Sequence, residues 1–101
     1  MGLDFAVDAL YQTGWTMHEP KALPRDPFGR PYPTREEVVR TFAEHGLSLN
    51  VRHVQLFDCY RAEWTDAAGN ARGAVVGQSA DEAAVYALSQ VRRQLAPAEG
   101  A

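Results

Sequence analysis

Cysteine, lysine and long apolar runs are all scarce in this chain of 101 residues. Cys59 is the only cysteine, so no disulfide can form within the chain, and this favours a reducing compartment. No stretch approaches the roughly 18 apolar residues that a membrane-spanning helix needs, and the N-terminus lacks a basic region followed by an apolar run. We therefore expect a cytoplasmic protein with neither a transmembrane helix nor a signal peptide.

The chain also lacks an excess of positive charge. Its formal net charge is −3, its pI is about 5.5, and Lys21 is the only lysine. Nucleic-acid binding by bulk electrostatic attraction scales with the phosphates that Lys and Arg neutralise, so this composition disfavours it and leaves only a local basic patch. Hydrophobic residues make up 46 %, which favours one folded domain over residues 1–96 with a disordered tail at 97–101.

Motifs with a known catalytic mechanism are absent from the sequence. It contains no Gly-rich phosphate loop, nucleophile elbow, paired-cysteine metal site or His-Glu-x-x-His helix. Cys59 and His53 are a conceivable nucleophile and base, although a cysteine between aromatic residues on a strand is more typical of a small buried hydrophobe. The possible zinc ligands are His18, His45 and His53 together with Cys59 or Asp58. Their spacing in the sequence matches no known zinc-ligand pattern. We therefore expect that the protein is not an enzyme and that it binds neither a metal ion nor a cofactor.

The first third of the chain combines a short helix with a long irregular segment. Apolar residues recur at helical spacing over residues 3–12, and Gly14 is placed to end this helix. Residues 15–33 hold five of the 6 prolines, which excludes a helix or a strand ladder. The aromatic residues of this segment either pin the loop onto the core or form a binding surface; they are Trp15, Phe28 and Tyr32.

Two capping boxes mark the starts of the other two helices. Thr34 and Glu37 open a helix that we expect to run to about residue 45, with Gly46 at its end. Ser79 and Glu82 open the last helix, which Pro97 ends. One apolar stripe follows this last helix, made of Ala80, Ala84, Ala87, Leu88, Val91 and Leu95.

Three strands are expected between these two helices. Apolar and polar residues alternate over 47–52 and over 59–65, and residues 66–70 have the composition of a hairpin loop. A third strand over 71–77 follows, while the position of the first turn within 53–58 stays open. A small antiparallel sheet needs cover on one face. The predicted fold is therefore α+β, in the order helix, proline-rich loop, helix, three-stranded antiparallel sheet, helix, with the helices packed on one face.

Charged residues on the predicted strands define a possible surface on the open face of the sheet. Strand parity places Tyr60 and Trp64 towards the helices, which argues against a base-stacking surface for RNA. The alternatives for the open face are a solvated surface with cross-strand ion pairs and a binding surface. Its residues are Arg52, Arg61, Glu63 and Arg72.

Residues 34–96, with a helix, three strands and a helix, resemble the double-stranded-RNA-binding fold. That family contacts RNA phosphates through lysines at the start of its final helix. This chain instead has Ser79-Ala80-Asp81-Glu82 there, and these carboxylates would repel phosphate. The resemblance therefore implies the fold without RNA binding.

A second resemblance covers about residues 3–93. The order of elements is similar to that of the phage ABA sandwich domain, a family of small phage-encoded proteins. The motifs that carry it are Gly14-Trp15, Tyr32-Pro33-Thr34, Cys59-Tyr60-Arg61-Ala62-Glu63-Trp64 and Glu82-Ala83. This resemblance implies a phage or mobile-element origin and assigns neither an activity nor catalytic residues.

The function expected from these observations is non-enzymatic binding to a host protein. An inhibitor of a host defence nuclease, of the anti-CRISPR kind, fits the size, the acidity and the lack of catalytic motifs. Carboxylates at Asp4, Asp8, Glu36, Glu37 and Glu44 either mimic phosphate together or are ordinary solvated helix faces. The alternative function is a nucleic-acid-binding module that uses the arginines of the sheet face. The expected partner surface comprises Trp15, Phe28, Tyr32, Glu36, Glu37, Arg52, Arg61, Glu63 and Arg72; the oligomeric state stays open.

Overall fold

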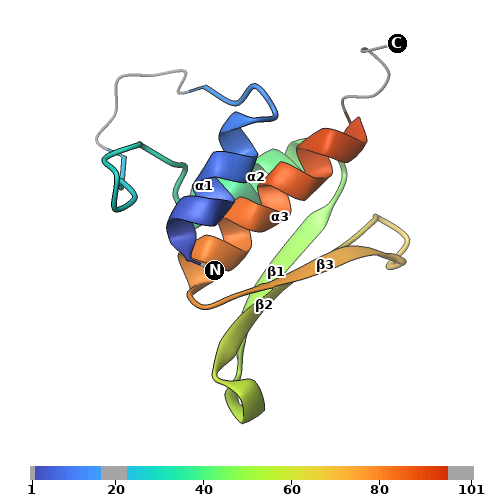
Figure 1. Ribbon diagram of the computed structural model, residues 1–101. Coiled ribbons are helices and arrows are strands. Elements are labelled where there is room, and N and C mark those ends of the chain that lie inside the picture. The colour runs from blue at the N-terminus through green and yellow to red at the C-terminus, as the bar shows by residue number, and fades with distance from the viewer. Residues whose placement is uncertain (1, 17–22, 96–101) are drawn as a thin grey trace.

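The computed structural model describes residues 2–16 and 23–95, which form three helices and one three-stranded antiparallel sheet (Figure 1). The helices are α1 (Leu3–Tyr11), α2 (Arg35–Glu44) and α3 (Ala80–Leu95). The strands are β1 (Ser48–Val54), β2 (Cys59–Thr65) and β3 (Ala71–Gly77), with a 3₁₀ turn, η1 (Gln55–Phe57), between β1 and β2. The predicted α+β class and order of elements are confirmed. The expectations for His18, Pro20, Pro97 and the tail over 97–101 fall outside the described residues.

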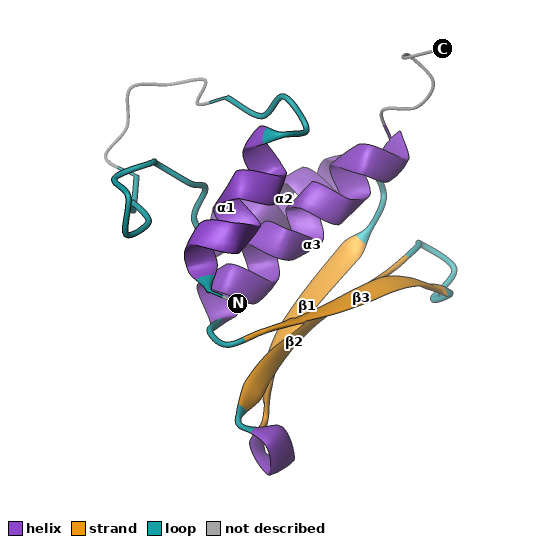
Figure 2. Ribbon diagram, in the orientation of Figure 1, coloured by secondary structure: helices purple, strands orange, loops and turns teal. Residues whose placement is uncertain are grey.

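The helices gather on one face of the sheet and leave its other face open (Figure 2). α3 packs against all three strands and against both other helices, while α2 also packs on β1. α1 packs chiefly on α3 and so forms the outer part of the helical layer. Within the described ranges, no helix is both long and apolar enough to cross a bilayer.

The core lies between the helices and the covered face of β2. Trp64 of β2 meets Phe42 of α2 edge to face, with ring centroids 5.5 Å apart, and both side chains are buried. Leu88 of α3 is buried in the same cluster, as are Val7 and Leu10 of α1. The helical periodicity of the sequence therefore places the expected apolar faces inward.

Both predicted capping boxes are present, the second in an altered form. The Glu37 amide donates to Thr34 Oγ1 at 3.2 Å, and the Thr34 amide donates to Glu37 Oε1 at 3.2 Å. The Glu82 amide donates to Ser79 Oγ at 3.0 Å, but the Glu82 carboxylate accepts from the amide of Gln78, one residue earlier than in a capping box. This contact joins the end of β3 to the start of α3 and satisfies a buried carboxylate.

The first turn of the sheet is η1. β1 runs to Val54, two residues past the alternation seen in the sequence, and β2 begins at Cys59. Asp58 closes the turn in the left-handed region with φ 50°, and its amide donates to the Gln55 carbonyl at 3.2 Å. β1 and β2 therefore pair along their full lengths, from Ser48 with Thr65 to Val54 with Cys59.

Candidate functional site

The described part of the proline-rich loop is organised around one buried carboxylate. Asp26 Oδ1 accepts hydrogen bonds from the amides of Phe28 at 3.0 Å and Arg30 at 2.8 Å, and its Oδ2 accepts from Arg30 Nε at 3.0 Å. Burial by itself raises the pKa of Asp26, but the hydrogen bonds from Arg30 and Phe28 and the charge of Arg30 outweigh it and lower that pKa. The loop around residues 25–31 is thus held in one conformation by its own side chains.

Arg30 also fastens this loop to α1. Its guanidinium donates to the Asp4 carbonyl at 3.1 Å, pairs with Asp8 at 3.3 Å and lies 5.6 Å from the centroid of the Tyr11 ring. The Tyr11 hydroxyl donates to the Pro31 carbonyl at 2.7 Å. The part of this loop over residues 23–33 therefore packs on the folded body.

The ionisation of Asp26 is expected to give the fold part of its pH dependence. Because the pKa of Asp26 is lower in the folded than in the unfolded chain, its contribution is present above the unfolded pKa and is lost as the pH falls through the folded pKa. We expect Asp26→Asn to be less stable at neutral pH and its unfolding free energy to fall less steeply between about pH 5 and pH 2.

Urea denaturation of both chains at several pH values measures this difference. Asp66, whose pKa is lowered mainly by the hydrogen bond from the Asn70 amide, is present in both chains and so cancels in the comparison. Equal pH slopes for the parent and for Asp26→Asn contradict the role given to Asp26.

The three aromatic residues of the loop have different environments. Tyr32 is only 5 % exposed, and its hydroxyl donates to Asp81 Oδ2 at 3.1 Å. Trp15 is half-buried, with its ring centroid 5.6 Å from that of Tyr11. Phe28 is 73 % exposed. The prediction that Tyr32 belongs to an exposed partner surface is therefore wrong, and the alternative that the aromatics pin the loop onto the core holds for this residue. Of these three residues, Phe28 is the most exposed.

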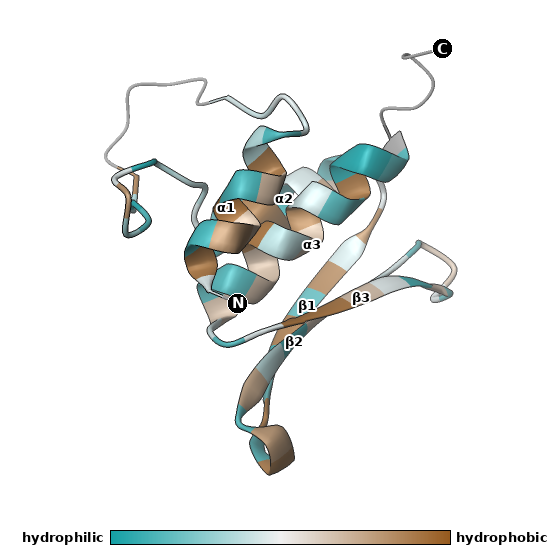
Figure 3. Cartoon of the chain, viewed as in Figure 1, coloured by the Kyte–Doolittle hydropathy of each residue, from teal (hydrophilic) through white to brown (hydrophobic). Residues whose placement is uncertain are grey.

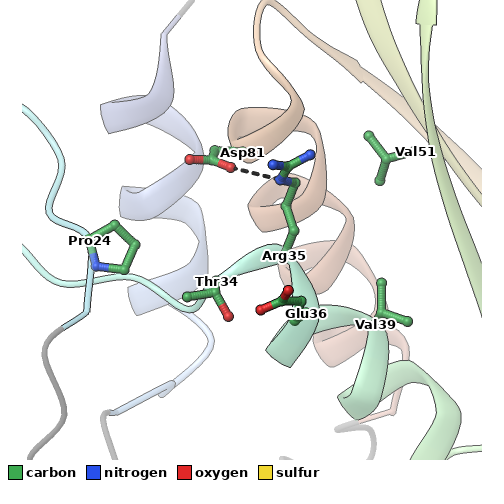
Figure 4. Close-up of a pocket in the computed structure, with 7 residues that line it drawn as sticks. All are labelled: Pro24, Thr34, Arg35, Glu36, Val39, Val51 and Asp81. Atoms are coloured by element: carbon green, nitrogen blue, oxygen red, sulfur yellow. Dashed lines mark ion pairs between the residues drawn. The ribbon is translucent and has the colours of Figure 1, made fainter.

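The acidic residues of α1 and α2 lie on separate helices, each packed on α3. Asp8 is paired with Arg30, and Glu37 serves the α2 capping box. Glu36 borders a shallow groove of about 680 Å³ where the loop meets α2 and β1 (Figure 4). Asp8 and Glu37 thus have separate local roles, one in an ion pair and the other in a helix cap.

The groove beside Glu36 combines a small apolar floor with an ion pair. Arg35 Nε lies 3.2 Å from Asp81 Oδ1, so the cation of the groove is already matched by a carboxylate (Figure 4). Its lining contains no histidine or cysteine, and the Thr34 hydroxyl caps α2. The polar groups of the groove are therefore a hydroxyl engaged in a helix cap, an ion pair and the Glu36 carboxylate. Its lining residues are Pro24, Thr34, Arg35, Glu36, Val39, Val51 and Asp81.

The open face of the sheet carries two arginines joined by one glutamate. Arg52 is paired with Arg61 across β1 and β2, and Glu63 Oε1 lies 3.4 Å from the Nε atom of each. Next to Arg61, Val76 of β3 is 48 % exposed. The predicted grouping of Arg52, Arg61 and Glu63 on one face is present, and this face carries one more positive than negative charge from these three residues.

Strand alternation predicted Arg72 on the same face, but Arg72 falls in a bulge where the regular alternation is interrupted. The pairing of β2 with β3 shifts between Trp64 and Thr65, which pair with Gly73 and Ala71 respectively. Arg72 is the extra residue of this bulge, and its Nη1 lies 3.5 Å from Asp66 Oδ2 in the adjoining hairpin loop.

The end of the β1–β2 hairpin is apolar and highly exposed. Leu56 is 82 % exposed and Phe57 is 73 % exposed, and the η1 turn that carries them is brown in Figure 3. β3 leaves the sheet at Gly77, opposite Tyr60, so the hairpin continues beyond the third strand. Figure 1 shows this end projecting away from the three helices.

Local contacts hold this turn in place without help from the helices. His53 Nε2 lies 3.1 Å from Asp58 Oδ1, and the His53 ring lies against Tyr60 with centroids 4.9 Å apart. Together with the Asp58 amide bond to Gln55, these contacts fix the base of the turn. An ordered turn loses less conformational entropy on binding than a flexible one.

Comparison with family models, curated proteins and solved structures finds no match to this chain. The two family resemblances seen in the sequence therefore stay predictions, as does the phage origin.

The predicted nucleophile and base, Cys59 and His53, do not share a face of the sheet. His53 is paired with Tyr60 and Val54 with Cys59, so His53 and Cys59 point to opposite faces of the hairpin. Across residues 2–16 and 23–95, no group of three or more His, Cys, Asp or Glu residues gathers as a metal site would require.

Sequence reasoning missed Leu56 and Phe57 as surface residues. Two neighbouring apolar residues between strands are as compatible with a buried strand end as with an exposed turn. The available clue was the Asp58 that follows them, since aspartate tolerates the left-handed conformation that closes a turn.

Proposed function

We propose that this protein is a non-catalytic module that binds a protein partner through its β1–β2 hairpin. We define the hairpin surface as Leu56 and Phe57 at the tip together with Arg52, Arg61 and Glu63 on the adjoining open face. The observation that carries the proposal is the exposure of two large apolar side chains on an ordered turn beyond the body of the domain. Water contact of apolar surface costs about 25 cal/mol per Å², so a partner that covers both side chains gains binding energy.

The charges beside the tip suit a protein interface. Glu63 lies within ion-pair distance of both arginines of this surface. Arginine and aromatic residues are enriched among the few side chains that dominate protein interfaces. The partner surface that would complement the hairpin is an apolar pocket for Leu56 and Phe57, with acidic groups on the side that faces Arg52 and Arg61.

Nucleic-acid binding, the alternative prediction, has less support. The α3 start that would meet phosphate carries Asp81 and Glu82, and Arg72 is matched by Asp66. Tyr60 and Trp64, which a base-stacking surface would use, lie on the strand face opposite Arg61.

The finer prediction is that the partner is a host defence nuclease and that binding inhibits it. Its support is the acidity and small size of the chain, the phage-type resemblance in the sequence and the lack of known catalytic motifs in the sequence. It depends on the broader proposal, because inhibition of this kind requires a protein interface.

Capture from a bacterial lysate on the immobilised chain tests the broader proposal. The comparison uses three baits: the parent, the double variant Leu56→Ser with Phe57→Ser, and Phe28→Ser. Phe28 has the same 73 % exposure as Phe57 but lies in the proline-rich loop, so it is a matched control. We expect a protein that the parent and Phe28→Ser retain and the double variant loses. A protein retained equally by all three baits contradicts the assignment of the hairpin.

A further inference from the structure

β3 is an outer strand of the sheet, and among the described residues nothing pairs with its free side. Natural proteins usually protect such edges with charged residues, prolines, bulges or a covering segment, because an open edge pairs with another strand. The bulge at Arg72 protects the start of β3, and Gly77 at its end is buried beside the first turn of α3, so the open stretch lies between them. From Gly73 to Gly77 the strand contains glycine, alanine and valine alone.

The other outer strand differs on each of these points. β1 carries Arg52 and His53, and α2 packs along it. On β3, Ala74 and Val76 are exposed on the open face, whereas Val75 is half-buried on the helical side. The unprotected edge of this sheet is therefore β3.

We propose that β3 pairs antiparallel with β3 of a second copy of this chain, which joins two three-stranded sheets into one of six strands. A twofold axis at Val75 places Val75 opposite itself and Ala74 opposite Val76, and the pairing stops short of the buried Gly77. No charged residue then faces its own copy, and no large side chain keeps the backbones apart. Because the same residues face each other across the twofold axis, the natural partner for this edge is another copy of the chain.

This pairing gives the exposed Val76 an apolar environment. On the open face, Ala74 and Val76 of both copies adjoin and shield one another from water. The β1–β2 hairpin continues past Gly77, so both tips stay accessible and the dimer offers two hairpin surfaces to a partner. A strand pair this short buries less than the roughly 1,200 Å² of stable interfaces, and the dimer is accordingly weak and concentration-dependent.

Sedimentation velocity from roughly 10 µM to roughly 1 mM tests the proposal over the relevant affinity range. We expect the mass to rise from 11.1 kDa towards twice that value. Val76→Lys should shift the dissociation constant at least about tenfold, because lysine on an edge strand opposes pairing. Val39→Lys is the matched control, since Val39 has a similar exposure of 42 % but lies on α2, and it should associate like the parent.

Hydrogen exchange at the two ends of this concentration range supplies a second readout. Amides of β3 should become more protected as the dimer forms, while those of β1 should not. A parent that stays monomeric at the highest concentration overturns the proposal. So does a dimer that Val76→Lys leaves intact, a dimer that Val39→Lys weakens equally, or protection that grows on β1 instead of β3.

Discussion

Replacing Trp64 with alanine is expected to lower the free energy of unfolding by about 3–5 kcal/mol. Trp64 is 2 % exposed, contacts Phe42 and lies directly over Gly73. A Cβ atom at position 73 would collide with Trp64 Cζ2, so the indole fills the space that a side chain on β3 would occupy. Since domains of this size have a total stability of about 5–15 kcal/mol, the variant should be close to unfolding.

Equilibrium urea denaturation measures this loss, with Trp64→Phe as the matched control. Phenylalanine keeps most of the ring volume and removes Trp64 Nε1, a buried donor without a hydrogen-bond partner in the described structure. We expect Trp64→Phe to lose much less stability than Trp64→Ala. A loss below about 1 kcal/mol for Trp64→Ala would show that this ring is not the centre of the core.

The elements that could be predicted from the sequence are those whose signals are local. The capping pair Thr34 and Glu37 and the alternation along β2 each specify a structure within a few residues. The apolar stripe of α3 likewise predicted which face it buries, including Leu88. These local signals were enough to predict the α+β arrangement.

The features that could not be predicted depend on contacts between distant residues. The sequence left open whether Tyr32 pins its loop to the core, because its hydrogen bond to Asp81, 49 residues away, has no local signal in a proline-rich segment. Arg72 is the unpaired extra residue of a bulge in β3, so strand alternation could not assign its face. A shift of one residue reverses the face to which a side chain points, and strand alternation alone does not reveal a bulge.

Only part of the hairpin surface could be predicted from the sequence, because the rest of it depends on how distant elements pack. Arg52, Arg61 and Glu63 follow from strand parity, and their expected grouping on one face is what the register produces. Leu56 and Phe57 depend on how far the hairpin extends past the helices, which is a property of the assembled fold.

The second large effect expected is on binding. Leu56→Ser with Phe57→Ser should weaken partner binding on the order of a thousandfold, or about 4 kcal/mol, because a few central apolar anchors carry most of the energy of an interface. The loss should appear mainly as faster dissociation. Both side chains are exposed in the free protein, so the double variant should fold and melt like the parent.

Titration of the captured and purified partner by calorimetry, against the parent, the double variant and Phe28→Ser, tests the central claim most directly. The hairpin assignment predicts that Phe28→Ser stays within about threefold of the parent, whereas the double variant loses about three orders of magnitude in affinity. A double variant that binds like the parent, or a Phe28→Ser chain that alone loses binding, would contradict it and place the interface elsewhere on the domain.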